Sequence, residues 1–183
     1  YGNVSSSDGY AAGIVSVNAG RIQDCVVGEE NQKLTIYSLG EEESGTVCAV
    51  NNGIIDASKP VGTQVVLEGN ASTFGGVTGR NNKTVQNINL TVMPKINRVA
   101  GKLTVGGVAG QNAGIIGQEK ETSADIQVSV DFENFDNYKY LGGIVGQNER
   151  GATVQNSTYT GTITEKMGMA GNCYGGITGD NSG

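Results

Sequence analysis

The stretch Gly142-Gly143-Ile144-Val145-Gly146-Gln147-Asn148 decides the fold, because the same heptapeptide recurs with small changes along the whole chain. Close copies begin at Gly75, Gly106 and Gly175, and weaker copies begin at Ala12 and Gly45. The asparagines that close the six copies stand at positions 18, 51, 81, 112, 148 and 181, so successive copies are 33, 30, 31, 36 and 33 residues apart. A repeat of this length, sustained along a chain, is typical of architectures built from stacked units.

Within each copy, three alternate positions carry an aliphatic residue, a very small residue and the asparagine. Because side chains in a strand alternate between its two faces, these positions predict one inward-facing side. The aliphatic residues are Ile14, Val47, Val77, Val108, Ile144 and Ile177. The small residues are Ser16, Ala49, Gly79, Gly110, Gly146 and Gly179.

If the copies stack in register, each of these positions becomes a ladder. We expect the aliphatic ladder to be buried and the small residues to let another backbone pass close by. The asparagine amides are expected to bond one another and the turn backbone. The residues predicted to hold the repeat are Gly76, Gly79, Asn81, Gly107, Gly110, Asn112, Gly143, Gly146, Asn148, Gly176, Gly179 and Asn181. The pattern predicts an all-β parallel β-solenoid with about one coil per repeat, and parallel crossovers favour right-handed winding.

Two further strands per repeat are expected, which makes three per coil. The second begins where an aliphatic residue returns after the asparagine turn, at Ile22, Ile55, Val85, Ile116 and Val154. The third is predicted from alternating apolar and polar residues in the stretches 34–39, 64–67, 102–105, 126–132 and 159–164. Loops of varying length are predicted at 40–44, 69–74, 133–140 and 165–174, and such loops mark the surface where binding is expected.

Composition agrees with a thin, coiled core in one domain, residues 1–183, with repeats beginning near 12, 45, 75, 106, 142 and 175. Glycine accounts for 30 of the 183 residues, and 37% of the chain is hydrophobic. The chain opens at Tyr1 without an initiator methionine and stops part-way into a repeat at Gly183. Because solenoids need capped ends, we interpret it as a piece of a longer protein.

Charge and cysteine content narrow the function classes. The formal net charge is −6, with no basic stripe for nucleic acid, and no apolar run approaches the roughly 18 residues of a membrane helix. The three cysteines, Cys25, Cys48 and Cys173, contain no Cys-x-x-Cys pair, so they are predicted to be buried free thiols. No cofactor or metal site is predicted.

The heptapeptide followed by a glycine-containing turn and an aliphatic-x-Asn-Ser or aliphatic-x-Asp-Cys segment resembles the GLUG repeat of bacterial surface proteins. The second segment is Val154-Gln155-Asn156-Ser157 in one copy and Ile22-Gln23-Asp24-Cys25 in another. The resemblance covers residues from about 12 to 183. It implies large secreted or wall-attached proteins, of the IgA-peptidase-like or filamentous-haemagglutinin-like kind, in which the repeats form an elongated solenoid without catalytic residues of their own.

The chain contains no histidine, which excludes Ser-His and Cys-His nucleophile pairs and histidine-based zinc sites. A carbohydrate-active β-helix is the alternative from another class, and it needs two carboxyl groups across the scissile bond. Asp24 and Asp56 lie near corresponding positions but one residue out of register. We therefore predict no catalytic residues.

Aromatic residues suggest one recognition surface. Phe132, Phe135, Tyr138 and Tyr140 lie in or beside the stretch that precedes Gly142. Aromatic faces with a polar edge suit sugar stacking, and the alternative is that these rings cover the edge of a coil. We predict a non-catalytic extracellular spacer or adhesion module of a bacterial surface protein, with a host glycan or protein as partner. The alternatives are a carbohydrate-active enzyme and an accessory domain of a surface peptidase.

Overall fold

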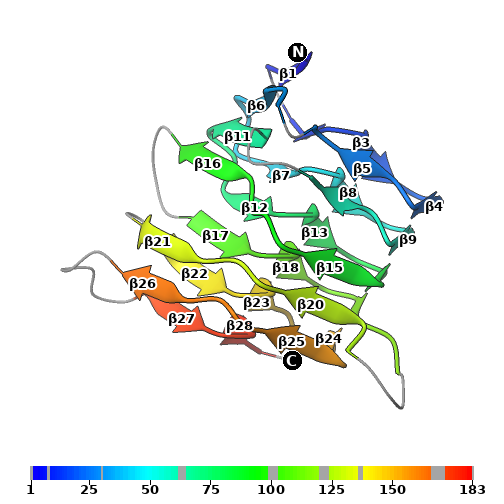
Figure 1. Cartoon of the computed structure of the whole chain (residues 1–183), viewed down its shortest axis with the longest axis vertical. Coiled ribbons are helices and arrows are strands. Elements are labelled where there is room, and N and C mark those ends of the chain that lie inside the picture. The colour runs from blue at the N-terminus through cyan, green and yellow to red at the C-terminus, as the bar shows by residue number, and fades with distance from the viewer. Residues whose placement is uncertain are drawn as a thin grey trace.

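The fold is a parallel β-solenoid. The computed structural model describes residues 2–7, 9–29, 31–61, 65–98, 103–119, 124–135, 138–165 and 172–182, and in these residues the named strands pair only in parallel. The coils stack along the long axis of the molecule, with the two termini at opposite ends (Figure 1). The prediction of an all-β parallel solenoid is confirmed.

Five short strands make each coil, and equivalent strands of successive coils pair to form five sheets, named I to V in chain order. Sheet I contains β1 (Gly2–Ser6), β6 (Leu34–Ser38), β11 (Val65–Gly69) and β16 (Lys95–Arg98), and is followed in the last coils by the pair β21 (Phe132–Phe135) and β26 (Ile163–Glu165). Sheet II contains β2 (Ala11–Ala12), β7 (Glu43–Gly45), β12 (Thr73–Gly75), β17 (Leu103–Gly106), β22 (Tyr138–Gly142) and β27 (Cys173–Gly175).

The remaining strands complete the coil. Sheet III contains β3 (Val15–Asn18), β8 (Cys48–Asn51), β13 (Thr78–Asn81), β18 (Ala109–Asn112), β23 (Val145–Asn148) and β28 (Thr178–Asn181). Sheet IV contains β4 (Arg21–Gln23), β9 (Ile54–Asp56), β14 (Thr84–Gln86), β19 (Ile115–Ile116) and β24 (Thr153–Val154). Sheet V contains the pair β5 (Val26–Val27) and β10 (Lys59–Pro60), followed by β15 (Ile88–Leu90), β20 (Ile126–Val128) and β25 (Ser157–Tyr159).

The repeat and the coil coincide. Asn112 of β18 pairs with Asn148 of β23, and Asn148 pairs in turn with Asn181 of β28. One sequence repeat therefore advances the chain by one coil, as predicted.

The heptapeptide forms two strands rather than the single strand that was predicted. Gly142 ends β22, Gly143 and Ile144 form a bend, and Val145 begins β23. A Cβ atom on Gly142 would stand 1.8 Å from the carbonyl oxygen of Val145, so this bend requires glycine. Because the chain turns here, the alternation of faces stops, and Ile144 and Val145 are both fully buried.

The aliphatic ladder is continuous across this bend. Val47, Val77, Val108 and Ile144 are fully buried, whereas Ile14 in the first coil is 42% exposed and Ile177 in the last is 38% exposed. The amide of Val108 donates to the carbonyl of Ile144 over 2.9 Å. The expected buried ladder is thus confirmed for the inner coils.

The small residues allow close contact between backbones, as predicted. A Cβ atom on Gly146 would lie 2.7 Å from the carbonyl oxygens of both Gly110 and Val105. A Cβ atom on Gly79 would lie 2.7 Å from the amide nitrogen of Ser44. Sheets II and III therefore pack backbone against backbone, and only a very small side chain fits between them.

The expectation of three strands per coil is wrong, because five are present. The stretches predicted as an equivalent third strand fall on different sheets: 34–39 on sheet I, 102–105 on sheet II and 126–132 largely on sheet V. The segments predicted as loops contain the strands of sheet II, namely β7, β12, β22 and β27. Alternation occurs on every sheet of a coil, so it does not identify which sheet a segment joins.

A corner between sheets IV and V divides the predicted second strand. Asp24, Ala57, Asn87 and Asn156 occupy it with φ of 54°, 49°, 55° and 45°. This left-handed conformation is rare for residues other than glycine, and Asp and Asn adopt it most readily. The chain therefore turns sharply after β4, β9, β14 and β24.

The three cysteines are free thiols, as predicted, but they are not all buried. Only Cys48 is buried, and burial raises the pKa of its thiol to about 11. Cys25 is half-buried and Cys173 is exposed on the last coil. The prediction of burial is therefore wrong for Cys25 and Cys173.

Candidate functional site

The closing asparagines form an unbroken side-chain ladder, which is the most regular polar feature of the molecule. The amide Nδ2 of Asn18 donates to Oδ1 of Asn51 over 2.8 Å, and the bond repeats at 2.8, 2.8, 2.8 and 2.9 Å up to Asn181. Asn51, Asn81 and Asn112 are fully buried. Every bond points in the same direction, from one coil to the following one.

Ladder amides also bond the backbone of their own turn and of the following coil. Oδ1 of Asn112 accepts a hydrogen bond from the amide of Gly114 over 3.2 Å, and its Nδ2 donates to the carbonyl of Thr153 over 3.2 Å. The same pattern holds for Asn51, which accepts from Gly53 and donates to Thr84. The amides therefore satisfy polar groups that burial would otherwise leave unpaired, as the sequence predicted.

A second ladder runs beside the first, one residue earlier in the sequence and facing outward. Arg80 donates to Gln111 over 2.8 Å, Gln111 to Gln147 over 3.3 Å, and Gln147 to Asp180 over 3.1 Å. Arg80 also forms a two-point ion pair with Glu149, at 2.8 and 3.0 Å. This outer ladder joins four coils, and the sequence analysis missed it.

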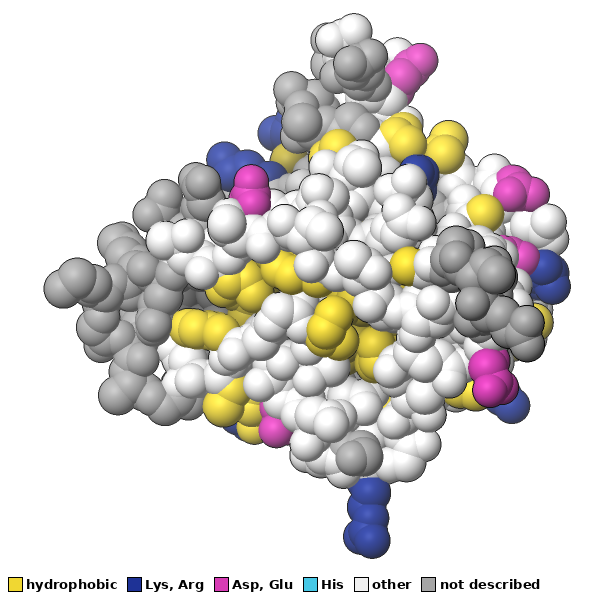
Figure 2. All heavy atoms as spheres, turned by 60° about the horizontal axis from the view of Figure 1, so that its bottom comes forward, with side chains coloured by type: hydrophobic (Ala, Val, Ile, Leu, Met, Phe, Trp, Pro, Cys, Tyr) yellow, Lys and Arg dark blue, Asp and Glu magenta, His cyan; other side chains and the backbone are white. Residues whose placement is uncertain are grey.

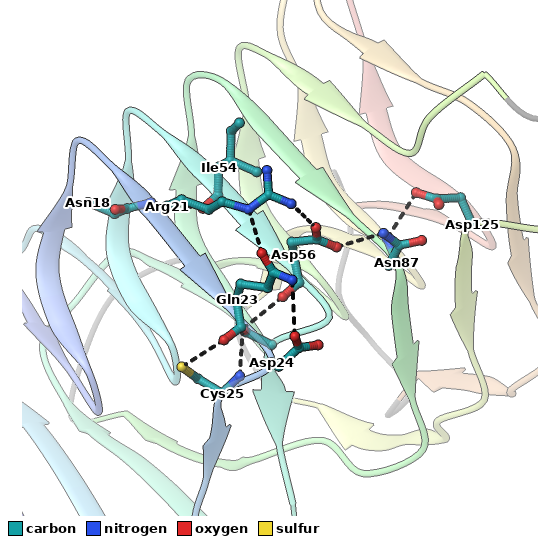
Figure 3. A network of polar contacts seen from close by, with 10 residues as sticks. Asn18, Arg21, Gln23, Asp24, Cys25, Ile54, Asp56, Asn87 and Asp125 are labelled. Atoms are coloured by element: carbon teal, nitrogen blue, oxygen red, sulfur yellow. Dashed lines mark hydrogen bonds and ion pairs between the residues drawn. The ribbon is translucent and has the colours of Figure 1, made fainter.

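A buried carboxylate forms the centre of a third polar network, shown in Figure 3. Asp56 at the end of β9 accepts hydrogen bonds from Arg21 and from the side chain of Asn87. The backbone amide of Asn87 donates to Asp125 over 3.0 Å. The network thus links four successive coils beside the corner, and Asn87 is its one member among Arg21, Asp56, Asn87 and Asp125 that has the left-handed corner conformation.

The environment of Asp56 keeps its carboxyl ionised. Burial raises its pKa, but the hydrogen bonds from Asn87 and Gln86 and the charge of Arg21 outweigh burial, so the pKa lies below its usual value. A carboxylate held in this state accepts hydrogen bonds and does not supply a proton near neutral pH. Asp24, the other acid considered for catalysis, follows β4 and lies one residue out of register with Asp56, as the sequence indicated.

Acidic side chains gather near Arg80. Burial and the nearby charge of Glu42 raise the pKa of Glu43, while its backbone hydrogen bond and Arg80 lower it. The net shift is upward. Among the residues that the structure describes, no group of three or more Cys, Asp or Glu residues is arranged to hold a metal ion.

The aromatic residues proposed as a sugar platform do not form one surface in the described part of the chain. Phe132 is 1% exposed and packs against Tyr159 of the next coil, with ring centroids 6.4 Å apart. A buried ring has no free face for a sugar, so Phe132 belongs to the core. Tyr140 is half-buried on β22, with the Lys139 ammonium 4.7 Å from its ring centroid. The side chains of Phe135 and Tyr138 lie outside the described residues.

Two hollows lie toward opposite ends of the stack. The hollow at the C-terminal end, of about 410 Å³, is lined by Asn148, Ala152, Thr153, Val154, Ile177, Thr178 and Asn181. Figure 2 shows hydrophobic side chains in a band across this end. Val154 and Ile177, which line this hollow, follow Ile116 and Ile144 of the respective preceding coils, both of which are fully buried.

The second hollow lies on the outer face of sheet I, where β1 and β6 pair. It measures about 540 Å³ and is lined by Asn3, Val4, Ser5, Lys33, Thr35 and Tyr37. None of these residues belongs to the repeated heptapeptide, and the sequence analysis did not single them out. Their position on facing strands becomes visible only when the register of β1 and β6 is known.

One coil of the stack matches a known sequence family. The model of the GLUG motif matches residues 137–164, which extend from the start of β22 into β26. Residues 137–164 therefore contain one GLUG motif, and the heptapeptide Gly142–Asn148 lies inside it. No curated protein and no solved structure matches it. One GLUG motif therefore corresponds to one coil, and the asparagine ladder extends that equivalence to the copies before and after it. The described residues contain no helix of the length and apolarity needed to cross a membrane.

Proposed function

We propose that this GLUG-repeat chain is a non-catalytic β-solenoid spacer or adhesion module of an extracellular bacterial surface protein. The observation that carries the proposal is the asparagine ladder, whose five bonds connect every coil to the next. A module of this kind needs stiffness along its axis and a surface on which contacts can be displayed. The ladders supply the first property, and the outward faces of the sheets supply the second.

Stiffness follows from how the coils are joined. Separating the coil of Asn112 from the coil of Asn148 breaks the ladder bond, the Gln111 to Gln147 bond and the parallel backbone pairing of β18 with β23 together. Because these bonds lie side by side, they must break cooperatively rather than one at a time. A GLUG-repeat rod of this kind would hold a distal segment away from the cell surface.

The polar chemistry of the described residues favours this function over hydrolysis. Asp56, a buried acid of the network, is held as a carboxylate by Arg21 and Asn87. Glycosidase chemistry needs a second carboxyl group with the opposite protonation at a defined distance. We therefore assign Asp56 to the support of the corner.

Labelling of intact cells tests the proposed location. Antibodies raised against the 183-residue chain are applied to bacteria that make the full protein, before and after permeabilisation. The proposal expects labelling of intact cells, and labelling that appears only after permeabilisation would contradict it.

A chemical assay tests the non-catalytic part. The chain is incubated with a panel of polysaccharides, and newly formed reducing ends are measured, with an Asp56→Asn variant as the matched control. We expect no release with either protein. If the native chain releases reducing ends and Asp56→Asn does not, the chain is a carbohydrate-active enzyme instead.

A further inference from the structure

The polar side chains that line the hollow on sheet I point outward, whereas Val4, which also lines it, pairs with the buried Ile36. Lys33, directly before β6, and Thr35 and Tyr37 within β6 follow each other at every second position, and the intervening Ile36 is fully buried. Asn3 and Ser5 likewise occupy alternate, outward positions on β1, where Asn3 pairs with Thr35 and Ser5 pairs with Tyr37. The register therefore brings an amide, two hydroxyls, a phenol and an ammonium group to one outer surface.

Within the described part of the chain, these polar side chains make no polar contact with other side chains. Asn3, Ser5, Lys33, Thr35 and Tyr37 make no side-chain hydrogen bond or ion pair with any residue in the described ranges. In the ladders, by contrast, the side chains of Asn112 and Gln111 are bonded to both neighbouring coils. Unengaged donors and acceptors beside an aromatic ring remain available for a ligand.

We propose that this outer face binds a short oligosaccharide that carries a carboxylate group. The Tyr37 ring offers an apolar face for a pyranose, and the hydroxyls and amide of Ser5, Thr35 and Asn3 suit sugar hydroxyls. Lys33 supplies an ammonium group that forms no ion pair with any described residue, in a chain whose net charge is −6. A carboxylate is the sugar substituent that complements this charge.

The layout of the face sets the length and direction of the ligand. Lys33 and Tyr37 are four residues apart along an extended strand, so their Cα atoms are separated by roughly 13 Å. A single pyranose ring does not span that distance, and a chain of two or more sugars does. Glu68 of the next coil pairs with Tyr37 and repels an anion there, so the carboxylate is directed toward Lys33. The volume of about 540 Å³ lies within the range of roughly 300 to 1,000 Å³ typical of ligand sites.

Titration monitored by amide chemical shifts tests the proposal directly. Digalacturonate and a hyaluronan disaccharide serve as acidic probes, and galabiose serves as the neutral counterpart of digalacturonate with the same linkage. At least one acidic probe is expected to shift the amide signals of β1 and β6 saturably. Galabiose is expected to bind the same residues more weakly.

Variants separate the two parts of the site. Lys33→Gln should weaken the acidic sugar by roughly 1.4- to 5-fold, the range of an exposed ion pair, and leave galabiose unchanged. Tyr37→Ala should weaken both sugars by roughly 2- to 12-fold through loss of the ring. Lys95→Gln is the matched control, because Lys95 is an exposed lysine on the outer face of the same sheet two coils away.

Three results would overturn the proposal. They are the absence of saturable shifts in β1 and β6 with either acidic probe, equal binding of galabiose and digalacturonate, and an effect of Lys95→Gln as large as that of Lys33→Gln. The site does not depend on the cellular location of the module. Failure of the sugar titration and failure of cell-surface labelling are therefore separate outcomes.

Discussion

The side of each coil that contains the asparagine turn differs from the side that contains sheet I in how its polar groups are used. At the turn, Asn81 and Asn112 are buried and bonded to both neighbouring coils. On the outer face of sheet I, one row of paired residues reads Asn3, Thr35, Val66 and Lys95; only Val66 in it is buried, and its members share no chemistry. A buried amide needs an identical partner in the coil above and in the coil below, so the same residue recurs at that position in every repeat. A solvated position needs none, so its sequence is free to vary and to acquire a ligand.

The largest expected effect comes from filling the space between sheets II and III. Gly146→Val should lower the free energy of unfolding by about 3 kcal/mol, the upper end of the usual range for overpacking, because the new side chain meets two backbone carbonyls that cannot move aside. Chemical denaturation measures the change. Gly20→Val is the control, since no atom lies within 4 Å of a Cβ placed there. Equal destabilisation by both variants would show that the tight contact at Gly146 is not the cause.

Interrupting the ladder should have the next largest effect. Asn112→Ala removes the acceptor of Asn81 and the donor to Asn148, and it leaves buried polar groups without partners. We expect a loss of about 2 kcal/mol. Asn82→Ala is the control, because its side chain donates to Asn52 at an exposed site and accepts from the half-buried Arg80, so its loss should cost no more than about 1 kcal/mol. If the two variants unfold at the same denaturant concentration, a bond of the buried ladder contributes no more to the free energy of unfolding than a surface hydrogen bond.

The Asp56 network should give a smaller effect that depends on pH. The pKa of Asp56 is lower in the folded chain than in the unfolded chain, so its stabilisation is present above the ordinary carboxyl pKa of about 3.9 and is lost as the pH falls through the folded value. The half-exposed side chain of Arg21 limits the size of the effect through solvent screening. Denaturation midpoints measured from pH 7 downward should fall less steeply for Asp56→Asn than for the native chain.

The pH comparison has an internal control. Glu43 has a raised pKa in the folded chain, so its contribution favours the folded state at low pH and is lost as the pH rises through that value. Because both proteins retain Glu43, the difference between them isolates Asp56. Asp24→Asn, at an exposed neighbouring acid, should follow the native curve. If the denaturation midpoints of the native chain and of Asp56→Asn depend on pH in the same way, Asp56 does not stabilise the fold.

The smallest effect is expected on sheet I. Thr35→Ala removes a hydroxyl without a partner in the described residues and should change the free energy of unfolding by less than about 0.5 kcal/mol. Thermal denaturation of this variant beside Asn112→Ala compares the two sides of the coil directly. If Thr35→Ala destabilises the fold as much as Asn112→Ala, the outer face is structural and not available for binding.

Much of the fold follows from the heptapeptide, because its residues meet copies of themselves. The aliphatic ladder, the small residues at the close contact and the asparagine ladder were all predictable from spacing. The corners were harder. Nothing in the alternation of Gly142 to Asn148 marks the bend at Gly143, although the paired glycines were a signal for it. The Asp and Asn residues at 24, 87 and 156 were likewise a signal for the left-handed corner, although Ala57 occupies it without one.

The candidate sites were less predictable, because they join residues from different coils. Phe132 was expected on a surface, but Tyr159 from the next coil covers it. Arg80 and Glu149 are 69 residues apart and still form an ion pair. Spacing by whole repeats places residues in the same column of the stack, but it does not say whether a column faces the core or the solvent. Because insertions change the spacing between repeats, the sequence does not show the register of the strands outside the heptapeptide.

The sequence by itself determined that the chain stacks one coil per repeat, with Val108 below Ile144 and Asn112 below Asn148, because ladders of identical buried groups require equal spacing. Only the tertiary structure decided that each coil has five strands, that Asp56 is surrounded by Arg21 and Asn87, and that Lys33 and Tyr37 share an outer face. These features depend on where the backbone turns. The turns are set by contacts between neighbouring coils, which no single repeat contains.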